Sequence, residues 1–99
     1  MSRKTAIVTG AARGIGAETA RALAADGVNL SLAVRKPDAA TELVNELKQF
    51  DVKVIVVSCD VSNHAEVATM VQTTIERLGR VDILVNNAGL NIRRPSTDV

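Results

Sequence analysis

A glycine-rich segment at residues 9–16 sets the strongest limit on how this chain folds. Its sequence, TGAARGIG, follows directly after the apolar run at residues 6–8 and precedes a helical pattern. A strand that turns sharply into a helix offers an anion the unpaired N–H groups and the partial positive charge of the helix N-terminus. Gly10 permits the sharp turn, and Gly14 and Gly16 allow the helix to begin close to a phosphate and to the sheet. The segment therefore predicts a βαβ unit with a pyrophosphate site.

Short aliphatic runs alternate with helical patterns along the chain, as in repeated βαβ units on a parallel sheet. Strands are expected at 5–9, 28–34, 53–58 and 81–85, and helices at 14–26, 37–50 and from Ser62 or Asn63 to 78. Gly27 and Gly79 stand where C-terminal helix caps belong. The continuous apolar run at residues 54–57 predicts burial on both faces of the sheet.

Each helix is expected to bury one stripe of side chains. The expected stripes are Ile15, Thr19, Ala22 and Leu23 in the first helix, Leu43, Leu47 and Phe50 in the second, and Val67, Met70, Val71, Ile75 and Leu78 in the third.

Right-handed crossovers then limit the topology. The first two helices lie on one face and the third crosses to the other, which gives a three-layer α/β fold of the Rossmann type with strand order 3-2-1-4. The fourth strand would be an edge with its apolar residues 83–85 exposed. We therefore expect this sheet to be incomplete at that edge, with more strands and helices after Val99, so that residues 1–99 form the N-terminal part of one domain.

Composition excludes several classes of partner. The 99 residues suffice for one small domain. The 12 basic and 11 acidic residues give a net charge of +1 and are scattered along the chain, so no positively charged patch is expected that would bind nucleic acid or an anionic membrane. No apolar run approaches the roughly 20 residues of a membrane span. A single cysteine, Cys59, fits a reducing compartment, so we expect a cytoplasmic protein. Metal-ligand spacing is absent, and the lone His64 is expected to be exposed.

Two further polar segments follow predicted strands. Residues 86–89, NNAG, come directly after the fourth strand, whose carboxyl end adjoins that of the first at the switch point where such sheets bind ligands. Asp60 and Val61 follow the third strand. A plain Asn/Gly turn is the alternative for the first segment, and a role in starting the third helix is the alternative for Asp60.

The pattern Thr-Gly-x-x-x-Gly-x-Gly at residues 9–16, together with NNAG at 86–89, resembles the classical short-chain dehydrogenase/reductase family. The resemblance covers the whole chain and implies NAD(P)-dependent hydride transfer to or from an alcohol or carbonyl carbon. It implies that Asn87 lies near the adenosine ribose and that Asp60 and Val61 read the adenine. The implied cofactor contacts of the glycine-rich turn are Gly10, Ala12, Arg13, Gly14, Ile15 and Gly16.

The residues after the second strand favour NADP over NAD. An NAD site usually has an acid there for the ribose hydroxyl, whereas an arginine suits a 2′-phosphate. The window at residues 34–36 reads VRK, so Arg35 is placed for the phosphate, and Arg13 could hold it from the other side. NAD remains an alternative because of Asp38, since a small shift of the loop would bring this carboxylate to the ribose of the nucleotide.

The family's catalytic apparatus has no counterpart here. Its acid/base is a tyrosine in a Tyr-x-x-x-Lys motif, assisted by a serine and an asparagine, and this chain contains no tyrosine. We assign no catalytic residue and expect this stretch alone not to reduce carbonyls, although the longer protein would be an enzyme and, like many members, an oligomer. The alternatives are a non-catalytic nucleotide-binding module and an assembly element that completes its sheet with a partner.

Overall fold

The structure, a computed structural model, describes residues 3–11 and 14–86. Its elements, in chain order, are β1 (Thr5–Thr9), α1 (Gly14–Ala25), β2 (Asn29–Val34), the 3₁₀ helix η1 (Pro37–Ala40), α2 (Thr41–Leu47), β3 (Val54–Ser58), α3 (His64–Leu78) and β4 (Ile83–Asn86). Each expected strand and helix is present, with ends shifted by a residue or two at most places. The second helix differs more, because it begins as a 3₁₀ turn at Pro37 and ends before Phe50.

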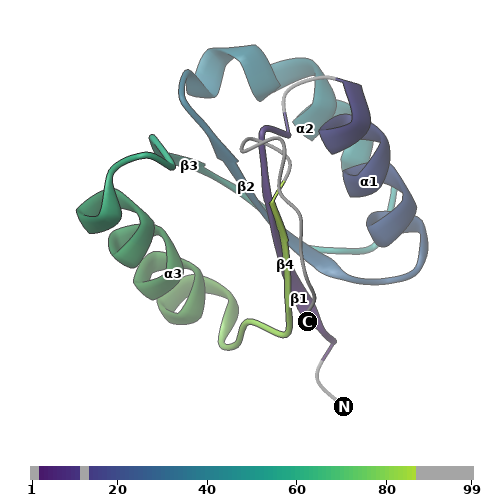
Figure 1. The fold of residues 1–99 in the computed structure, drawn as a ribbon. Coiled ribbons are helices and arrows are strands. Elements are labelled where there is room, and N and C mark those ends of the chain that lie inside the picture. The colour runs from purple at the N-terminus through teal and green to yellow at the C-terminus, as the bar shows by residue number, and fades with distance from the viewer. Residues whose placement is uncertain (1–2, 12–13, 87–99) are drawn as a thin grey trace.

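The strands form one parallel sheet in the order β3-β2-β1-β4, as predicted. Helices α1 and α2 cover one face of this sheet, and α3 covers the other (Figure 1). Thr9 at the end of β1 pairs with Ala33 of β2 and with Asn86 of β4. The carboxyl ends of these three strands therefore meet at one edge of the sheet.

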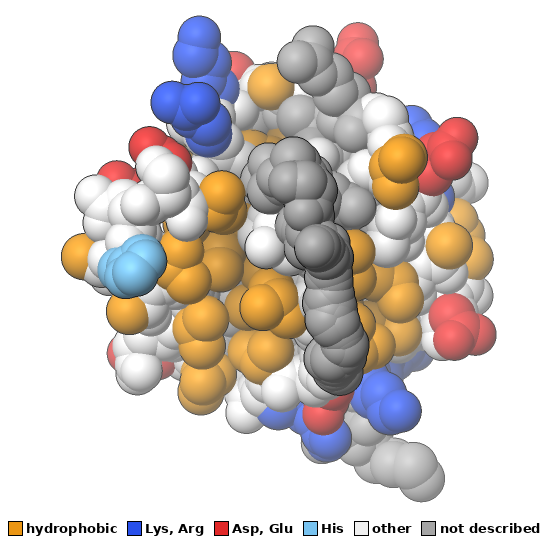
Figure 2. Space-filling model, in the orientation of Figure 1, with side chains coloured by type: hydrophobic (Ala, Val, Ile, Leu, Met, Phe, Trp, Pro, Cys, Tyr) orange, Lys and Arg blue, Asp and Glu red, His pale blue; other side chains and the backbone are white. Residues whose placement is uncertain are grey.

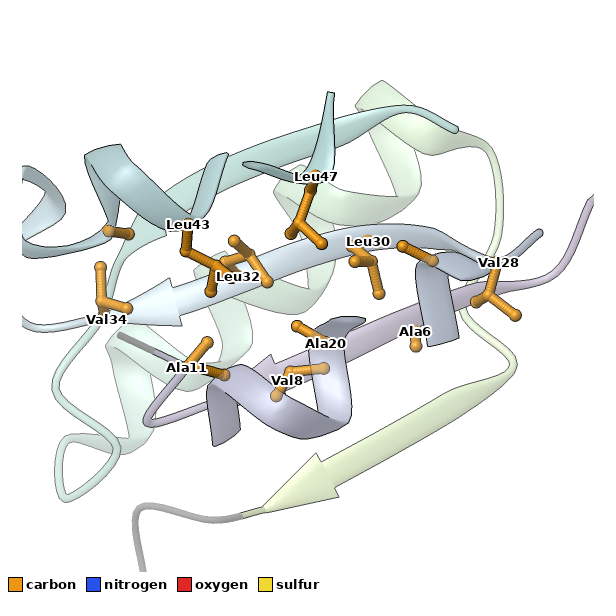
Figure 3. Close-up of a cluster of buried hydrophobic side chains, with 13 residues drawn as sticks. Ala6, Val8, Ala11, Ala20, Val28, Leu30, Leu32, Val34, Leu43 and Leu47 are labelled. Atoms are coloured by element: carbon orange, nitrogen blue, oxygen red, sulfur yellow. The ribbon is translucent and has the colours of Figure 1, made fainter. Parts of the chain in front are cut away.

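The larger group of buried side chains lies between the sheet and α1 and α2 (Figure 3). Alternate strand residues such as Val8 and Leu32 are buried there in one cluster with Leu43 and Leu47 of α2. The stripe expected for α1 was wrong at Ile15, which is 73% exposed, and at Ala22, which is also exposed, whereas Leu23 packs against the core. The buried residues of α1 are Gly16, Ala17, Ala20 and Ala24. Small residues on this face let the helix axis come close to the sheet, which a search for large apolar side chains misses.

A smaller group of buried side chains lies between α3 and the sheet and consists of Ile7, Ala33, Cys59 and Met70. The expected burial of Ile75 was wrong, because its side chain is 43% exposed and the neighbouring Thr74 is fully buried instead. The Thr74 hydroxyl lies 2.8 Å from that of Ser31 on β2 and donates to the carbonyl of Met70. This polar pair satisfies both hydroxyls inside the sheet–helix contact.

Both outer strands are less covered than the central pair. The apolar run of β3 is only half-buried, because β3 lies at an edge of the sheet. At the opposite edge, the side chain of Leu84 on β4 is 59% exposed. Among residues 3–11 and 14–86, none of the helices combines the length and the apolar character that a bilayer crossing requires.

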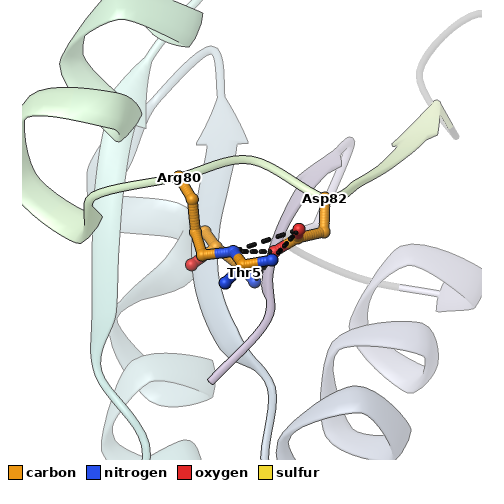
Figure 4. A network of polar contacts seen from close by, with 3 residues as sticks. All are labelled: Thr5, Arg80 and Asp82. Atoms are coloured by element: carbon orange, nitrogen blue, oxygen red, sulfur yellow. Dashed lines mark hydrogen bonds and ion pairs between the residues drawn. The ribbon is translucent and has the colours of Figure 1, made fainter. Parts of the chain in front are cut away.

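A polar network joins the start of β4 to the start of β1 (Figure 4). The Asp82 carboxylate accepts from the Thr5 amide at 2.9 Å and from the Arg80 guanidinium at 2.7 Å, and the Asp82 amide donates to the Thr5 carbonyl at 2.9 Å. The Arg80 side chain, followed by the Thr5 amide, lowers the pKa of Asp82. The network therefore stabilises the β1–β4 register most when Asp82 is ionised.

Asp82→Asn is expected to lower the urea midpoint of unfolding at pH 7, because the ion pair with Arg80 is lost. Since the pKa of Asp82 is lowered by folding, its stabilising contribution is complete above the unfolded pKa of about 3.9 and disappears as the pH falls through the folded pKa. The difference between wild type and variant should therefore shrink below about pH 4. Urea titrations at several pH values measure it, with Asp26→Asn at an exposed position as the control. A difference that persists undiminished in acid would contradict the ionic origin.

Candidate functional site

A cleft of about 1060 Å³ opens at the carboxyl ends of β1, β2 and β3. Four of the predicted site residues line it together, namely Gly10, Arg35, Asp60 and Val61. The other lining residues in the described part of the chain are Ala33, Val34, Lys36, Ala39, Cys59 and Ser62. Segments that are up to 52 positions apart in the sequence, from Gly10 to Ser62, are therefore brought to one hollow by the strand order.

The glycine-rich turn is fixed against β2 and against its own helix. Gly10 has a φ of 60°, in the left-handed region that favours glycine, and its amide donates to the Ala33 carbonyl at 3.1 Å. Gly16 lies where α1 passes over this turn, and a Cβ built on it would stand 2.2 Å from the Gly10 carbonyl oxygen. Gly14 and Ile15 are exposed in the first turn of α1. The absence of a side chain at Gly16 is thus a packing requirement of the turn.

Two basic residues follow β2 and line the cleft. Arg35 and Lys36 are both exposed, and the positive charge of Arg35 contributes to lowering the pKa of Asp60. One wall of the cleft therefore presents positive charge toward its opening, which suits an anionic group.

The loop between β3 and α3 forms another wall. Oδ1 of Asp60 accepts from the Ser62 amide at 3.0 Å and from the Ser62 hydroxyl at 2.7 Å. These two bonds, the hydroxyl first, lower the pKa of Asp60, so its carboxyl group stays ionised at neutral pH. Asn63 caps α3 by accepting from the Glu66 amide, and Glu66 in turn accepts from the Asp60 amide at 2.8 Å. Asp60 therefore does take part in the start of α3, while it also lines the cleft.

Cys59 lies at the back of the cleft and is almost fully buried. Burial, reinforced by the negative charges of Glu66 and Asp60, raises the pKa of its thiol. The thiol is therefore protonated at neutral pH and behaves as a small packed side chain.

The ends of β1 and β4 are joined beside the cleft. The Thr9 hydroxyl donates to Oδ1 of Asn86 at 3.0 Å and to the Val85 carbonyl at 3.3 Å. A second hollow of about 310 Å³ lies here, lined by Thr9, Val61, His64, Val67, Met70, Leu84 and Asn86. Figure 2 shows hydrophobic side chains gathered on this face between α3 and β4. The predicted site residues Ala12, Arg13 and Asn87 lie outside the described residues.

Among the lining residues with charged or hydroxyl side chains, sequence reasoning did not assign Lys36 and Ser62 to the site. Lys36 directly follows Arg35, so its position after a strand was the available signal. Ser62 was considered only as a cap of α3, yet its spacing of two residues from Asp60 is that of an Asx turn.

Comparison with known proteins relates this chain to one protein family. The short chain dehydrogenase family matches residues 4–99. The 7alpha-hydroxysteroid dehydrogenase of Escherichia coli is 40% identical over 86 residues, which are 87% of this chain and 34% of that protein.

Solved structures agree in fold. The L-sorbose reductase of Gluconobacter frateurii, complexed with NADPH and L-sorbose, has a TM-score of 0.82 at 37% identity, over 90% of this chain and 34% of that one. The carveol dehydrogenase of Mycobacterium avium, in complex with NAD, has a TM-score of 0.82 at 29% identity, over 90% and 36%. The chain therefore spans about a third of the length of these relatives. From the match over residues 4–99 and the shared sheet, we conclude that this chain belongs to the short-chain dehydrogenase/reductase family of oxidoreductases.

Proposed function

We propose that residues 1–99 are the N-terminal part of a nucleotide-binding domain, in an oxidoreductase that transfers a hydride between NADP(H) and an alcohol or carbonyl substrate. The observation that carries this proposal is the convergence of Gly10, Arg35 and Asp60 on one cleft at the carboxyl ends of the strands. Structural relatives with NADPH and with NAD support a nicotinamide nucleotide in this family. The residues after β2 favour NADP.

The residues of the cleft fit the parts of such a nucleotide. The left-handed Gly10 and the adjacent start of α1 suit a pyrophosphate, which the turn residues Ala12, Arg13, Gly14, Ile15 and Gly16 would surround. Arg35 would bind the 2′-phosphate through its planar guanidinium. The ionised Asp60 would accept a hydrogen bond from the adenine amine, with Val61 beside the ring and Asn87 near the ribose. When bound, the nucleotide supplies or takes up the hydride.

The chemistry of the substrate side is not assigned to this chain. The sequence contains no tyrosine, so the acid/base of the family mechanism has no candidate among these residues. In this proposal the chain binds the nucleotide, orients it across the carboxyl ends of the strands and selects between a 2′-phosphate and a 2′-hydroxyl.

Isothermal titration of the purified protein with NADPH and NADH tests the proposal. We expect one saturable site that binds NADPH more tightly, because the positive charges of Arg35 and Lys36 in the cleft lining favour a 2′-phosphate over a hydroxyl. Titration with 2′,5′-ADP and with 5′-AMP is the matched control, since these ligands differ only in that phosphate. Absence of binding by all four nucleotides would contradict the proposed function, and equal affinity within each pair would contradict the NADP preference.

A further inference from the structure

Ser62 holds the Asp60 carboxylate in one orientation. Its amide and its hydroxyl both donate to the same oxygen, Oδ1, at 3.0 and 2.7 Å. Within residues 3–11 and 14–86, no donor forms a hydrogen bond to the other oxygen, Oδ2. Both residues line the cleft. The carboxylate is thus anchored through one oxygen and has the second available to a ligand.

The backbone of Asp60 is anchored as well. Its amide donates to the Glu66 carboxylate at 2.8 Å, and its carbonyl accepts from the Asn63 amide at 2.9 Å. Rotation of the side chain is therefore the main freedom left to this carboxylate, and the Ser62 hydroxyl restricts it. A carboxylate with a single rotamer recognises a donor with less loss of conformational entropy than one that must be ordered on binding.

We propose that Ser62 is a positioning residue for base recognition, which holds Asp60 so that Oδ2 accepts a hydrogen bond from an exocyclic amine such as that of adenine. This inference rests on the proposed nucleotide site. The contact between Asp60 and the amine belongs to that proposed site, and what is added is that Ser62 fixes the carboxylate for it. The fixed carboxylate distinguishes an amino-purine from a keto-purine, because its oxygen attracts an amine and repels a carbonyl oxygen.

The test compares the affinities of the purified protein for NADPH and for its hypoxanthine analogue, in which a carbonyl replaces the amine. In wild type we expect NADPH to bind about tenfold more tightly, as for one hydrogen bond to a charged group. Ser62→Ala should reduce this preference to about threefold, and Ser62→Thr, which keeps the hydroxyl, should restore it. Ser58→Ala, at an exposed position outside the cleft lining, is the matched control and should leave the preference unchanged.

The ratio of the two affinities separates positioning from a purely structural role. If Ser62 only stabilised the loop, Ser62→Ala would weaken both nucleotides equally and leave the ratio unchanged, which would overturn the inference while the proposed function stood. Asp60→Ala should abolish the preference altogether, and its survival in that variant would also overturn the inference. If wild type bound neither nucleotide, the proposed function would fall and this inference with it.

Discussion

Gly16→Ala is expected to lower the free energy of unfolding by about 2–3 kcal/mol and to abolish nucleotide binding. The new Cβ would stand 2.2 Å from the Gly10 carbonyl oxygen, 2.9 Å from its carbonyl carbon and 3.0 Å from Cα of Ala11. All three are backbone atoms, so the clash is relieved only by moving α1 away from the glycine-rich turn. That movement would open the contact between α1 and the sheet and would displace the amides proposed to bind the pyrophosphate.

Urea titration followed by far-ultraviolet circular dichroism measures this loss, because the chain contains neither tryptophan nor tyrosine for fluorescence. Gly79→Ala is the matched control. Gly79 has a φ of 91° with nothing within 4 Å of a built Cβ, so the same substitution there costs about 1 kcal/mol of backbone strain without a clash. In an unobstructed helix, glycine to alanine stabilises by about 1 kcal/mol. A Gly16→Ala protein as stable as wild type would therefore show that the turn and helix are not in contact.

Arg35→Asp is expected to weaken NADPH binding about 100-fold and to change NADH binding by no more than about threefold. The substitution removes the bidentate partner proposed for the 2′-phosphate and places a like charge opposite it. A ribose 2′-hydroxyl, by contrast, can donate to the new carboxylate. The ratio of NADPH to NADH affinity should therefore reverse in favour of NADH.

Titration of the two nucleotides at fixed ionic strength measures this ratio, since an exposed arginine and its phosphate are screened by salt. Arg77→Asp makes the same change of charge on α3, at an exposed residue outside the cleft lining, and controls for net charge. If the ratio is the same in Arg35→Asp as in wild type, Arg35 does not bind the 2′ substituent. Asp38 would then be the next residue to substitute.

Much of this architecture follows from local patterns. The glycine-rich turn, the apolar runs and the right-handed crossover rule sufficed for the strand order and for placing Gly10, Arg35, Asp60 and Val61 at one edge. The burial of α1 did not follow, because Ile15 looked like a core residue while the buried face is made of Gly16 and three alanines. Which face of a short helix is buried depends on how close its axis comes to the sheet, and that distance is a tertiary property.

The same limit applies to α3 and to Ser62. A buried threonine such as Thr74 is satisfied by a partner 43 positions away, Ser31, and no local pattern signals that pairing. The role proposed for Ser62 depends on which oxygen of Asp60 its two donors reach. The convergence of Gly10 and Asp60 on one cleft was therefore predictable from their spacing, whereas contacts that depend on side-chain geometry needed the folded structure.

The unequal covering of the sheet has a consequence for local unfolding. Among residues 3–11 and 14–86, the buried group between α3 and the sheet is smaller than the one on the side of α1 and α2, so separating α3 from the sheet exposes less of their apolar surface. Amide hydrogens of α3 would then exchange through partial openings that leave α1 and α2 in place. Asp60 and Ser62 directly precede α3 and would open with it, whereas Gly10, between β1 and α1, would stay with the larger group. A ligand that contacts both units would link them across the sheet edge and make their opening a single cooperative event.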